Sequence, residues 1–273
     1  MPKLAISIVL YAPERPLLAT VVDALVRACE NLSTVSNWTC ALDLVNNKPD
    51  EAHRDEIAQI AHAASTVLFT AELVEAGVNG GYGAGNNLSI RRHQNADYHL
   101  VLNPDVVVEQ DALTHALAYL VANPGVGLLT PQVKSFDNAR QYLCKQHPTL
   151  LDMFIRSASS PRLNKLFAQR ILRYEMRGHN YEDVIRPVPY TTGCFMLFRR
   201  SVLDRIGGFD EGFFLHYEDA DIGREVGLVS QTAYVPEVRV IHKWSRDTHK
   251  SWRSRWTTIK SGLRYFRKWG GVF

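Results

Sequence analysis

Three carboxylates fall within four residues of the chain, directly after a run of aromatic side chains. The acidic residues are Glu218, Asp219 and Asp221, and the aromatic residues before them are Phe213, Phe214 and Tyr217. Two like charges within a few ångströms raise each other's pKa, and apolar neighbours raise it further, so such a cluster can hold a general base or a cation. A solvated acidic run is the alternative, but such runs usually contain lysine rather than follow aromatic residues. The cluster therefore predicts a site for chemistry.

A glycine-rich segment lies at Asn79–Asn87, where four glycines occur within six residues. Glycine lets the backbone approach a ligand closely, and a helix that follows points its first N–H groups toward an anion. A glycine-rich loop alone is a weak signal, because a tight turn has the same composition. Its position between a predicted strand and a predicted helix favours a pyrophosphate-binding role.

Apolar strands alternate with helical patterns along the first hundred residues. Strands are predicted at 4–11, 40–45, 65–70 and 97–102, and helices at 17–32, at 51–64 and from about Asn86. This alternation indicates right-handed βαβ units and a mostly parallel sheet. Ligands of such sheets bind beyond the carboxyl ends of the strands, which here carry Tyr11, Asn46, Asn103 and Asp105.

The acidic cluster belongs to a longer pattern that resembles a known family. Gly207-Gly208-Phe209-Asp210-Glu211, then Phe213-Phe214, then Tyr217-Glu218-Asp219-x-Asp221 with Arg224, resembles the acceptor-side signature of family 2 glycosyltransferases, and most of all their bacterial rhamnosyltransferase-like branch. The segment 79–87 is similar to the same branch. The resemblance runs from about Leu4 to His242. It implies a GT-A fold, which is an α/β fold with a Rossmann-like, mostly parallel sheet, helices on both faces and here a C-terminal helical segment.

The resemblance also implies roles for individual residues. Asp219 aligns with the catalytic base, and Glu218, Tyr217 and Asp221 with acceptor-binding positions, although Asp221 is also expected to orient Arg224 or the start of the helix. The sequence does not separate the roles of the three carboxylates. The implied nucleotide-sugar contacts are Tyr11, Asn46, Asn79, Gly81, Tyr82, Asn86, Asn103 and Asp105. Val45 stands where the family usually has an aspartate that binds the pyrimidine base of the nucleotide. Recognition of that pyrimidine is therefore left to Asn46, Asn47, Asp43 or the main chain.

A metal site is expected at Asp105, which ends Asn103-Pro104-Asp105 where the family has Asp-x-Asp. Mg²⁺ takes only one or two protein carboxylates, together with phosphate oxygens and water, so one aspartate can suffice. A turn that caps the next helix is the other interpretation. His242 closes a predicted strand, where a lone histidine is more often structural, but the resemblance makes it a second ligand for Mg²⁺ or Mn²⁺.

Composition fits one large domain. The chain has 273 residues, of which 46% are hydrophobic and 22% charged, and its four cysteines show no close pairing of the zinc or redox kind. With no signal-peptide pattern and no run of about 18 apolar residues, we expect a reducing, cytosolic setting without a membrane span. The predicted division is a GT-A domain at 1–241, with a nucleotide-sugar half at 1–105 and an acceptor half at 106–241, followed by a helical segment at 242–273.

The C-terminal segment is basic and aromatic. Residues 243–268 contain nine lysines and arginines and a single acidic residue, and four of the five tryptophans lie in 244–269. This composition is typical of an interfacial helix on anionic lipid, where each basic group contributes about 1 kcal/mol. Packing on the domain's own core is the alternative. Nucleic acid is not an expected partner, because no binding motif is present and the acidic cluster suits a phosphate backbone poorly.

Together these observations predict an inverting glycosyltransferase. The expected donor is dTDP-L-rhamnose and the expected acceptor a hydroxyl of a lipid-linked oligosaccharide in bacterial surface polysaccharide synthesis, at the cytoplasmic face of the inner membrane. Another UDP, dTDP or GDP sugar is an alternative donor. A nucleotidyltransferase is expected to have a basic glycine-rich loop in the first βα turn, but residues 11–16 contain no glycine. A non-catalytic membrane-associated protein would leave the acidic cluster unexplained.

Overall fold

A nine-stranded sheet forms the centre of the computed structural model, which describes residues 1–48, 51–158, 160–243 and 252–270. The strands are β1 (Lys3–Leu10), β2 (Thr39–Asn46), β3 (Phe69–Glu75), β4 (Tyr98–Leu102), β5 (Val106–Val108), β6 (Val126–Lys134), β7 (Arg140–Gln141), β10 (Phe195–Arg199) and β11 (Gln231–His242). Their order is β3-β2-β1-β4-β10-β6-β11-β5, with β7 paired to β6. A separate ribbon pairs β8 (Cys144–Lys145) with β9 (Tyr190–Thr191).

The first half of the sheet is parallel, as the alternating pattern predicted. Strands β3, β2, β1 and β4 all run in the same direction. Strand β10 is antiparallel to both β4 and β6, whereas β11 is parallel to β6. The reversal at β10 places the β9–β10 turn at the same edge as the carboxyl end of β4.

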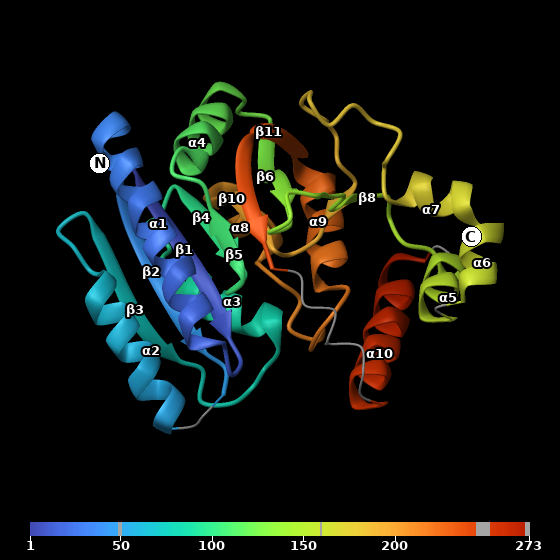
Figure 1. The fold of residues 1–273 in the computed structure, drawn as a ribbon, viewed down its shortest axis with the longest axis horizontal. Helices are drawn as coiled ribbons and strands as arrows, with labels where there is room; N and C mark the ends of the chain where they lie inside the picture. Colours follow the sequence, from blue (N-terminus) through green and yellow to red (C-terminus); the bar gives the residue numbers. More distant parts are fainter. Residues whose placement is uncertain (49–50, 159, 244–251, 271–273) are drawn as a thin grey trace.

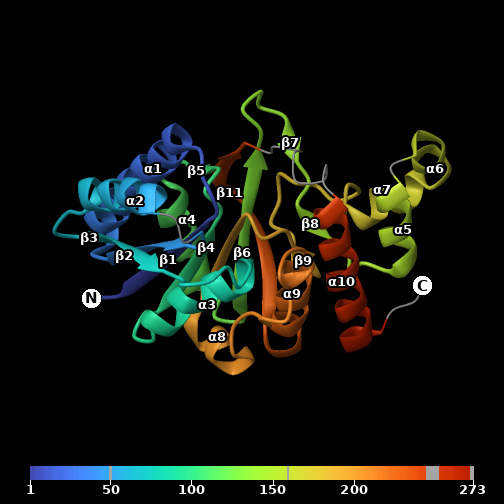
Figure 2. The same ribbon diagram turned by 90° about the horizontal axis from the view of Figure 1, so that it is seen from below.

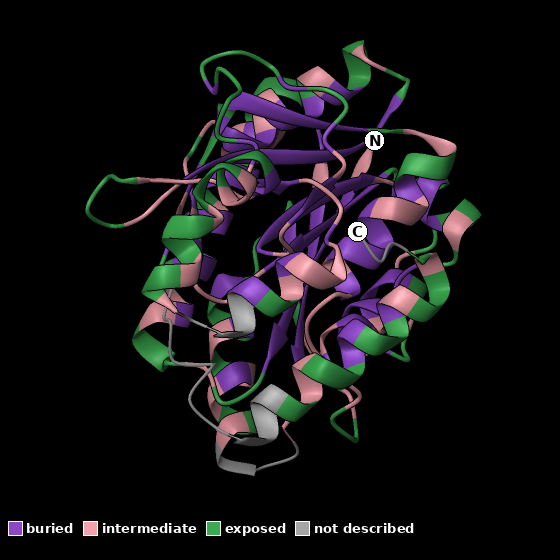
Figure 3. Cartoon of the chain, turned by 90° about the vertical axis from the view of Figure 1, so that its right-hand side faces the viewer, coloured by how far each residue is buried: buried purple, intermediate pink, exposed green. Residues whose placement is uncertain are grey.

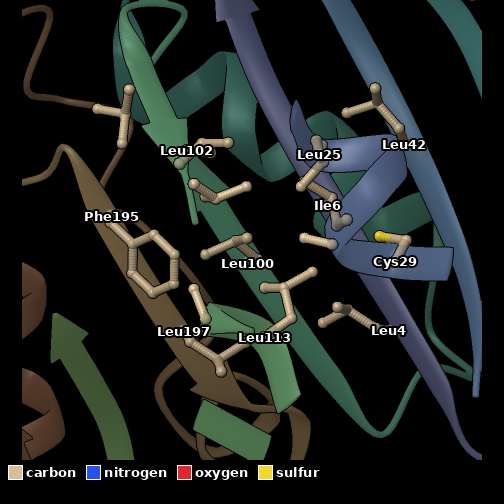
Figure 4. Close-up of a cluster of buried hydrophobic side chains, with 14 of the residues drawn as sticks. Leu4, Ile6, Leu25, Cys29, Leu42, Leu100, Leu102, Leu113, Phe195 and Leu197 are labelled. Carbon is tan, nitrogen blue, oxygen red and sulfur yellow. The ribbon is translucent and has the colours of Figure 1, made fainter. Parts of the chain in front are cut away.

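Helices cover both faces of the sheet (Figures 1 and 2). They are α1 (Arg15–Ser36), α2 (Glu51–Ala64), α3 (Tyr82–Arg92), α4 (Ala112–Ala122), α5 (Leu150–Ala158), α6 (Pro161–Leu166), α7 (Ala168–Tyr174), α8 (Arg200–Ile206), α9 (Glu218–Val229) and α10 (Trp252–Trp269). The larger core packs α1, α2 and α4 on one face, and a second core packs α3, α8 and α9 on the other. Figure 4 shows part of the larger core, in which Leu25 and Cys29 of α1 lie over Ile6 and Leu42.

Burial follows this layering. Figure 3 shows strands that are buried along most of their length and helices whose outward faces are exposed. The four cysteines are buried and unpaired, as their spacing suggested. Among the described residues, no helix combines the length and the apolarity that crossing a bilayer requires.

Two predicted boundaries were wrong. The third strand was expected at 65–70 but begins at Phe69, because Ser65 and Thr66 form a turn in which the Ser65 hydroxyl donates to Ala61 O and accepts from the Ala71 N–H. Such local side-chain bonds compete with strand pairing. The third helix was expected from about Asn86 but begins at Tyr82, so the glycine-rich segment is helical from Tyr82 onward.

The glycines within this helix allow close packing. A Cβ on Gly83 would lie 2.9 Å from Phe209 Cβ, and one on Gly85 would lie 2.8 Å from a Val9 methyl carbon. Helix α3 can therefore contact both β1 and the loop that precedes α9. The glycine-rich segment thereby joins the parallel half of the sheet to the acidic motif.

Candidate active site

The acidic motif forms the loop before α9 and the first turn of that helix. The side chain of Asn87 in α3 pairs with the main chain of Phe209: its Oδ1 accepts from the Phe209 N–H, and its Nδ2 donates to the Phe209 carbonyl, both at 2.9 Å. The same Nδ2 lies 2.9 Å from Glu211 Oε1. A Cβ on Gly208 would lie 2.5 Å from Asn87 Oδ1, which accounts for the glycine. Asn87 therefore fixes the start of the motif.

The residues directly before the carboxylates have a strained backbone. His216 and Tyr217 both have φ of +68°, in the left-handed region that non-glycine residues rarely adopt. Each such residue costs of order 1–3 kcal/mol and persists only where the surroundings over-determine it, commonly at functional sites. Helix α9 begins immediately after this turn, so Glu218 and Asp219 lie in its first turn, where the helix dipole favours negative charge.

Asp219 faces the turn between β9 and β10. Its Oδ2 accepts from the Gly193 N–H at 3.2 Å, and its Oδ1 accepts from the Ala220 N–H at 2.8 Å. The Tyr82 hydroxyl lies 2.6 Å from the Gly193 carbonyl oxygen and 2.9 Å from Asn103 Oδ1. Four segments that are distant in sequence therefore meet at this turn, and they include three of the predicted site residues.

Glu218 is almost completely buried, with 6% of its surface exposed. Its Oε2 has no hydrogen-bond partner within the described part of the chain. Burial, and then the neighbouring Asp219 charge, raise the pKa of Glu218 to about 8. Burial also raises the pKa of Tyr82, with the Glu218 and Asp219 charges acting in the same direction. Glu218 therefore favours its protonated form more than an ordinary glutamate does, which reduces the negative charge beside Asp219.

Asp221, the third carboxylate of the motif, is bound by the C-terminal helix. It is 1% exposed, its Oδ2 accepts from Lys268 Nζ at 2.9 Å, and its Oδ1 accepts from Trp269 Nε1 at 2.6 Å. Burial raises the pKa of Asp221, and the bonds to Lys268 and Trp269 oppose that rise. Both carboxylate oxygens are thus engaged by α10, so Asp221 joins the first turn of α9 to the C-terminal helix.

Two of the predicted nucleotide-sugar contacts have side chains already engaged within the protein. Asn86 is fully buried, where its Oδ1 accepts from Ser7 Oγ at 2.7 Å and its Nδ2 donates to the Tyr82 carbonyl at 3.0 Å. Asn46 Nδ2 donates to Glu75 Oε2 at 3.2 Å, and its Oδ1 accepts from the Lys48 N–H. Asn86 thus joins α3 to the interior of β1, and Asn46 joins the end of β2 to the end of β3. Tyr11, in contrast, is 64% exposed directly after β1.

The glycine-rich loop packs on the acidic loop. Gly81 has φ of +94°, and a Cβ there would lie 2.2 Å from the Phe214 carbonyl oxygen. That oxygen accepts from the Tyr82 N–H at 3.1 Å, and the exposed Asn79 accepts from the Gly81 N–H at 3.0 Å. The N–H groups of Gly81 and Tyr82 are therefore already bonded, which differs from the cradle of free N–H groups predicted for a pyrophosphate.

Asp105 and His242 lie beside each other. Asp105 Oδ1 is 3.4 Å from His242 Nε2, but this buried oxygen has no partner in hydrogen-bond geometry among the described residues. Gln141 Nε2 donates to the His242 carbonyl, so Gln141 Oε1 faces His242 Nδ1 at 3.0 Å and accepts a hydrogen bond from the Nδ1–H. In the neutral ring this arrangement leaves a lone pair on Nε2 directed at the carboxylate.

Two facing acceptors suit a divalent cation placed between them. No group of three or more His, Cys, Asp or Glu side chains with metal-site geometry occurs in the described ranges. A two-ligand site completed by phosphate oxygens and water is nevertheless within the usual chemistry of Mg²⁺, and the donor set also suits Mn²⁺. The residues present therefore fit the metal that the sequence led us to expect.

The sequence did not assign an individual role to Asn87, Gly193 or Gln141, although the family resemblance implies donor or acceptor contacts near the turn at residues 191–194. Asn87 carried a signal, because it ends the glycine-rich motif, and Gly193 lies in the small-residue turn before β10. Gln141 carried none, since only the fold brings β7 beside the end of β11. All three act through the main chain or through another side chain, a role that residue type alone does not reveal.

Comparisons with known proteins agree with this geometry. A family model described as glycosyltransferase-like family 2 matches residues 2–264. The chain is 28% identical over 187 residues to N-acetylglucosaminyl-diphospho-decaprenol L-rhamnosyltransferase of Mycobacterium tuberculosis, covering 64% of this chain and 60% of that protein. It is 28% identical over 201 residues to rhamnosyltransferase WbbL of Escherichia coli, covering 69% of this chain and 70% of that one.

Solved structures support the fold. Mannosyltransferase PcManGT from Pyrobaculum calidifontis, in complex with GDP-Man and Mn²⁺, superposes with a TM-score of 0.63 at 15% identity, over 97% of this chain and 64% of that chain. GalNAc-T7 with UDP, GalNAc and Mn²⁺ gives a TM-score of 0.69 at 12% identity, over 98% and 48%. At these identities the likeness concerns the fold alone, and it confirms the GT-A architecture expected from the sequence.

The raised pKa of Glu218 predicts a dependence of stability on pH. Between its ordinary value of 4.5 and about 8, the folded protein binds a proton that the unfolded chain releases. The free energy of unfolding should therefore fall as pH rises through this window. Glu218→Gln removes the titrating group, so its melting temperature should decline less between pH 5 and pH 8 than that of the unmodified protein.

The matched control is Glu237→Gln, which changes an exposed glutamate of β11. It should keep the slope of the unmodified protein in the same thermal unfolding series. Parallel curves for Glu218→Gln and Glu237→Gln would contradict the assignment of a bound proton to Glu218.

Proposed function

We propose, from the premise that the chain belongs to the glycosyltransferase-like family 2, that it is an inverting transferase that moves a hexose from a nucleotide sugar to an acceptor hydroxyl. The observation that carries this proposal is the position of Asp219. Its carboxylate lies at the start of α9, is held by the Gly193 N–H, and is joined through the β9–β10 turn to Tyr82 and Asn103. A base at that point is what direct displacement at an anomeric carbon requires.

The proposed step needs one proton acceptor and no covalent intermediate. Asp219 takes the proton from the attacking hydroxyl, while its bond to Gly193 keeps the carboxylate oriented. Glu218 keeps its own proton at neutral pH and so adds no charge that would hold the Asp219 proton too tightly. Its unpaired Oε2 is suited to a hydrogen bond with an acceptor oxygen. Glu218 and Tyr217 therefore stay in the proposal as acceptor-side residues.

Asp105 and His242 would hold Mg²⁺ or Mn²⁺ on the donor side. Such a cation, when bound, stabilises the negative charge that develops on a departing nucleotide diphosphate. Gln141 keeps the proton on His242 Nδ1 and so leaves Nε2 as the ligand atom. Asn103 is two residues from Asp105, and its N–H donates to the Cys194 carbonyl, next to the turn that holds Asp219. This connection brings the proposed metal and base onto adjoining segments.

We further propose L-rhamnose as the sugar, carried as dTDP-L-rhamnose, and a lipid-linked oligosaccharide as the acceptor. Two relatives support the sugar, since both are named as rhamnosyltransferases. The mycobacterial relative's name also specifies an N-acetylglucosaminyl-diphospho-decaprenol acceptor. The chain spans about 60% of the length of that relative.

A lipid-linked acceptor implies a membrane surface, and the outward face of α10 is a candidate for it. Trp256, Ile259 and Leu263 are 54%, 42% and 54% exposed at a spacing of three and four residues, which places them on one side of the helix. Lys260 adds a positive charge and lies 5.8 Å over the Trp256 ring. This face suits the interfacial region of an anionic membrane at the cytoplasmic side of the inner membrane.

The membrane proposal now rests on fewer basic residues than the sequence suggested. Residues 244–251, and the side chains of Arg253 and Arg255, lie outside the described part of the molecule. Arg264 and Lys268 belong to the inward side of α10, where they pair with acidic residues of the domain. The apolar side chains at 256, 259 and 263 therefore make the main proposed contribution.

The test of the catalytic assignment is Asp219→Asn, which keeps the shape of the side chain and removes its basicity. Release of nucleotide diphosphate, measured with dTDP-L-rhamnose and other nucleotide sugars in the presence of acceptor, should fall on the order of 10²-fold or more. Binding of the donor should change little. Asp204→Asn, at an exposed position of α8, serves as the control and should keep normal turnover. Normal turnover in Asp219→Asn would remove this residue from the proposed role.

The metal proposal predicts that a chelator abolishes transfer. Asp105→Ala should weaken binding of a nucleotide diphosphate when Mn²⁺ is present, and should have little effect when it is absent, because the lost ligand acts through the cation. Titration calorimetry with and without the metal measures this difference. His242→Ala should behave similarly, and Gln141→Ala more mildly. Full transfer in excess chelator would leave the diphosphate to be stabilised by protein groups alone.

The membrane proposal predicts that Ile259→Ser with Leu263→Ser reduces sedimentation with vesicles that contain anionic lipid. The loss follows from the apolar area that these side chains would bury. Val121→Ser, at a 62% exposed position of α4, should sediment normally. Transfer to a short soluble acceptor should be spared in the double variant. Absence of vesicle binding by the unmodified protein at low salt would exclude the membrane from the proposal.

A further inference from the structure

The inward side of α10 is bound to the segment that carries the proposed base. Lys268 Nζ lies 2.9 Å from Asp221 Oδ2 and 2.9 Å from Glu225 Oε1, so it bridges the first two turns of α9. Trp269 donates its indole N–H to the other oxygen of Asp221 at 2.6 Å. Asp221 is two residues from Asp219. A side chain near the C-terminus of the chain thereby reaches the immediate neighbourhood of the proposed base.

The same helix holds the loop before α9. Arg264 Nη2 donates to Asp210 Oδ1 at 2.7 Å and its Nε donates to Asp210 Oδ2 at 3.2 Å, which is a bidentate ion pair. Gly212 leaves room for this guanidinium, because a Cβ there would lie 2.1 Å from Arg264 Cζ. Ser261 Oγ donates to the Leu215 carbonyl at 2.9 Å. These contacts are spaced along one side of α10, so the helix binds the loop at several points.

The strained turn lies within these contacts. The Tyr217 ring is 5.6 Å from the Tyr265 ring and 6.2 Å from the Phe266 ring, and Tyr265 is fully buried. A residue held at φ of +68° relaxes unless its neighbours prevent it. The neighbours here are the α10 rings on the Tyr217 side chain, together with the α10 anchors at Leu215 and Asp221. Helix α10 thus restrains both sides of the turn that presents Glu218 and Asp219.

A role in packing alone does not require this arrangement. Asp221 is buried, and an unpaired buried carboxylate is costly, whereas an apolar residue there would pack at no such cost. The polar contacts therefore provide orientation that an apolar residue would not. Two hydrogen bonds, one from the Lys268 ammonium and one from the Trp269 indole, fix the direction of the Asp221 carboxylate in the first turn of α9. Orientation of that turn determines where the Asp219 carboxylate points.

We propose that Lys268, together with Trp269, is a positioning residue for the transfer reaction, and that it acts by holding Asp221 and with it the first turn of α9. The inference rests on the proposed function, in which Asp219 is the base. It adds a role for the C-terminal helix that is separate from any contact of its outward face with lipid.

The test compares Lys268→Met, Lys268→Arg and Trp269→Phe with Lys165→Met, a control at an exposed lysine of α6. With a soluble acceptor, Lys268→Met should lower kcat about tenfold or more and leave the KM for the nucleotide sugar within about twofold, because the donor-side residues are untouched. Lys268→Arg keeps a donor for Asp221 and should recover much of the loss. Trp269→Phe keeps the ring and should lose less than Lys268→Met.

Amide hydrogen exchange supplies a readout that does not depend on activity. The Asp221 N–H donates to the Tyr217 carbonyl at 2.8 Å, and the Gly193 N–H donates to Asp219, so both should exchange faster in Lys268→Met. Amides of α1 and of the parallel strands should not change. If Lys268→Met does not fold, the milder Trp269→Phe variant, measured by the same two methods, decides the question.

Two failures are distinguishable. Normal kcat and normal exchange at residues 216–222 in Lys268→Met would overturn the positioning role and leave the proposed function intact. A loss of kcat that Lys268→Arg does not recover, with faster exchange throughout the protein, would also overturn it, because α10 would then act only in overall stability. Absence of transfer by the unmodified protein would overturn the proposed function, and the exchange measurement would still determine whether Lys268 holds this segment.

Discussion

The pairing between the Asn87 side chain and the main chain of Phe209 connects the two halves of this molecule. An amide side chain carries a donor group and an acceptor group, and here the two groups bond to the main chain of the same residue, much as a neighbouring strand would. The contact joins residues 122 positions apart and lies in the interior. Because buried main-chain groups must be satisfied, loss of this amide would leave both the N–H and the carbonyl of Phe209 unpaired. The acidic loop therefore depends on α3 for its position.

The glycines on both sides of that contact have the same physical basis. Gly81 and Gly83 admit the backbone of Phe214 and the side chain of Phe209, and Gly208 admits the Asn87 amide. The glycine-rich segment and the acidic motif, which read as two separate motifs in the sequence, thus form one interface. Close approach to another part of the protein, rather than to a ligand, explains most of the glycines in this region.

Strand alternation allowed the parallel half of the sheet and the carboxyl-edge position of Asp105 to be predicted from the sequence, and the family resemblance implied the helices on both faces. Local periodicity carries that information, because strands and helices bury apolar residues at fixed intervals. The partners of Asn86 and Asp221 could not be predicted in this way. An asparagine beside a glycine-rich loop has the same local pattern whether it binds a ligand or, as here, accepts from Ser7 in the core. The start of β3 was misplaced because turn hydrogen bonds at Ser65 overrode an apolar run.

The environments of the three neighbouring carboxylates could not be predicted from the sequence either. Burial raises the pKa of Glu218, Asp219 is bonded to main-chain N–H groups, and Asp221 is paired with Lys268. The three residues are close neighbours in the sequence. Their environments differ because the first turn of α9 projects each side chain in a different direction. One direction leads to α10, some 47 residues further along the chain.

The basic residues of α10 divide by direction in the same manner. Arg264 and Lys268 neutralise acids of the loop and of α9, while Lys260 lies beside the exposed Trp256. A composition that suggests lipid binding when read along the chain thus contains two surfaces with different partners. Since a helix has opposite faces, contact of the outer face with a membrane would leave the inner contacts with Asp210 and Asp221 undisturbed. The proposed base and a lipid-linked acceptor would then approach each other across a single helix.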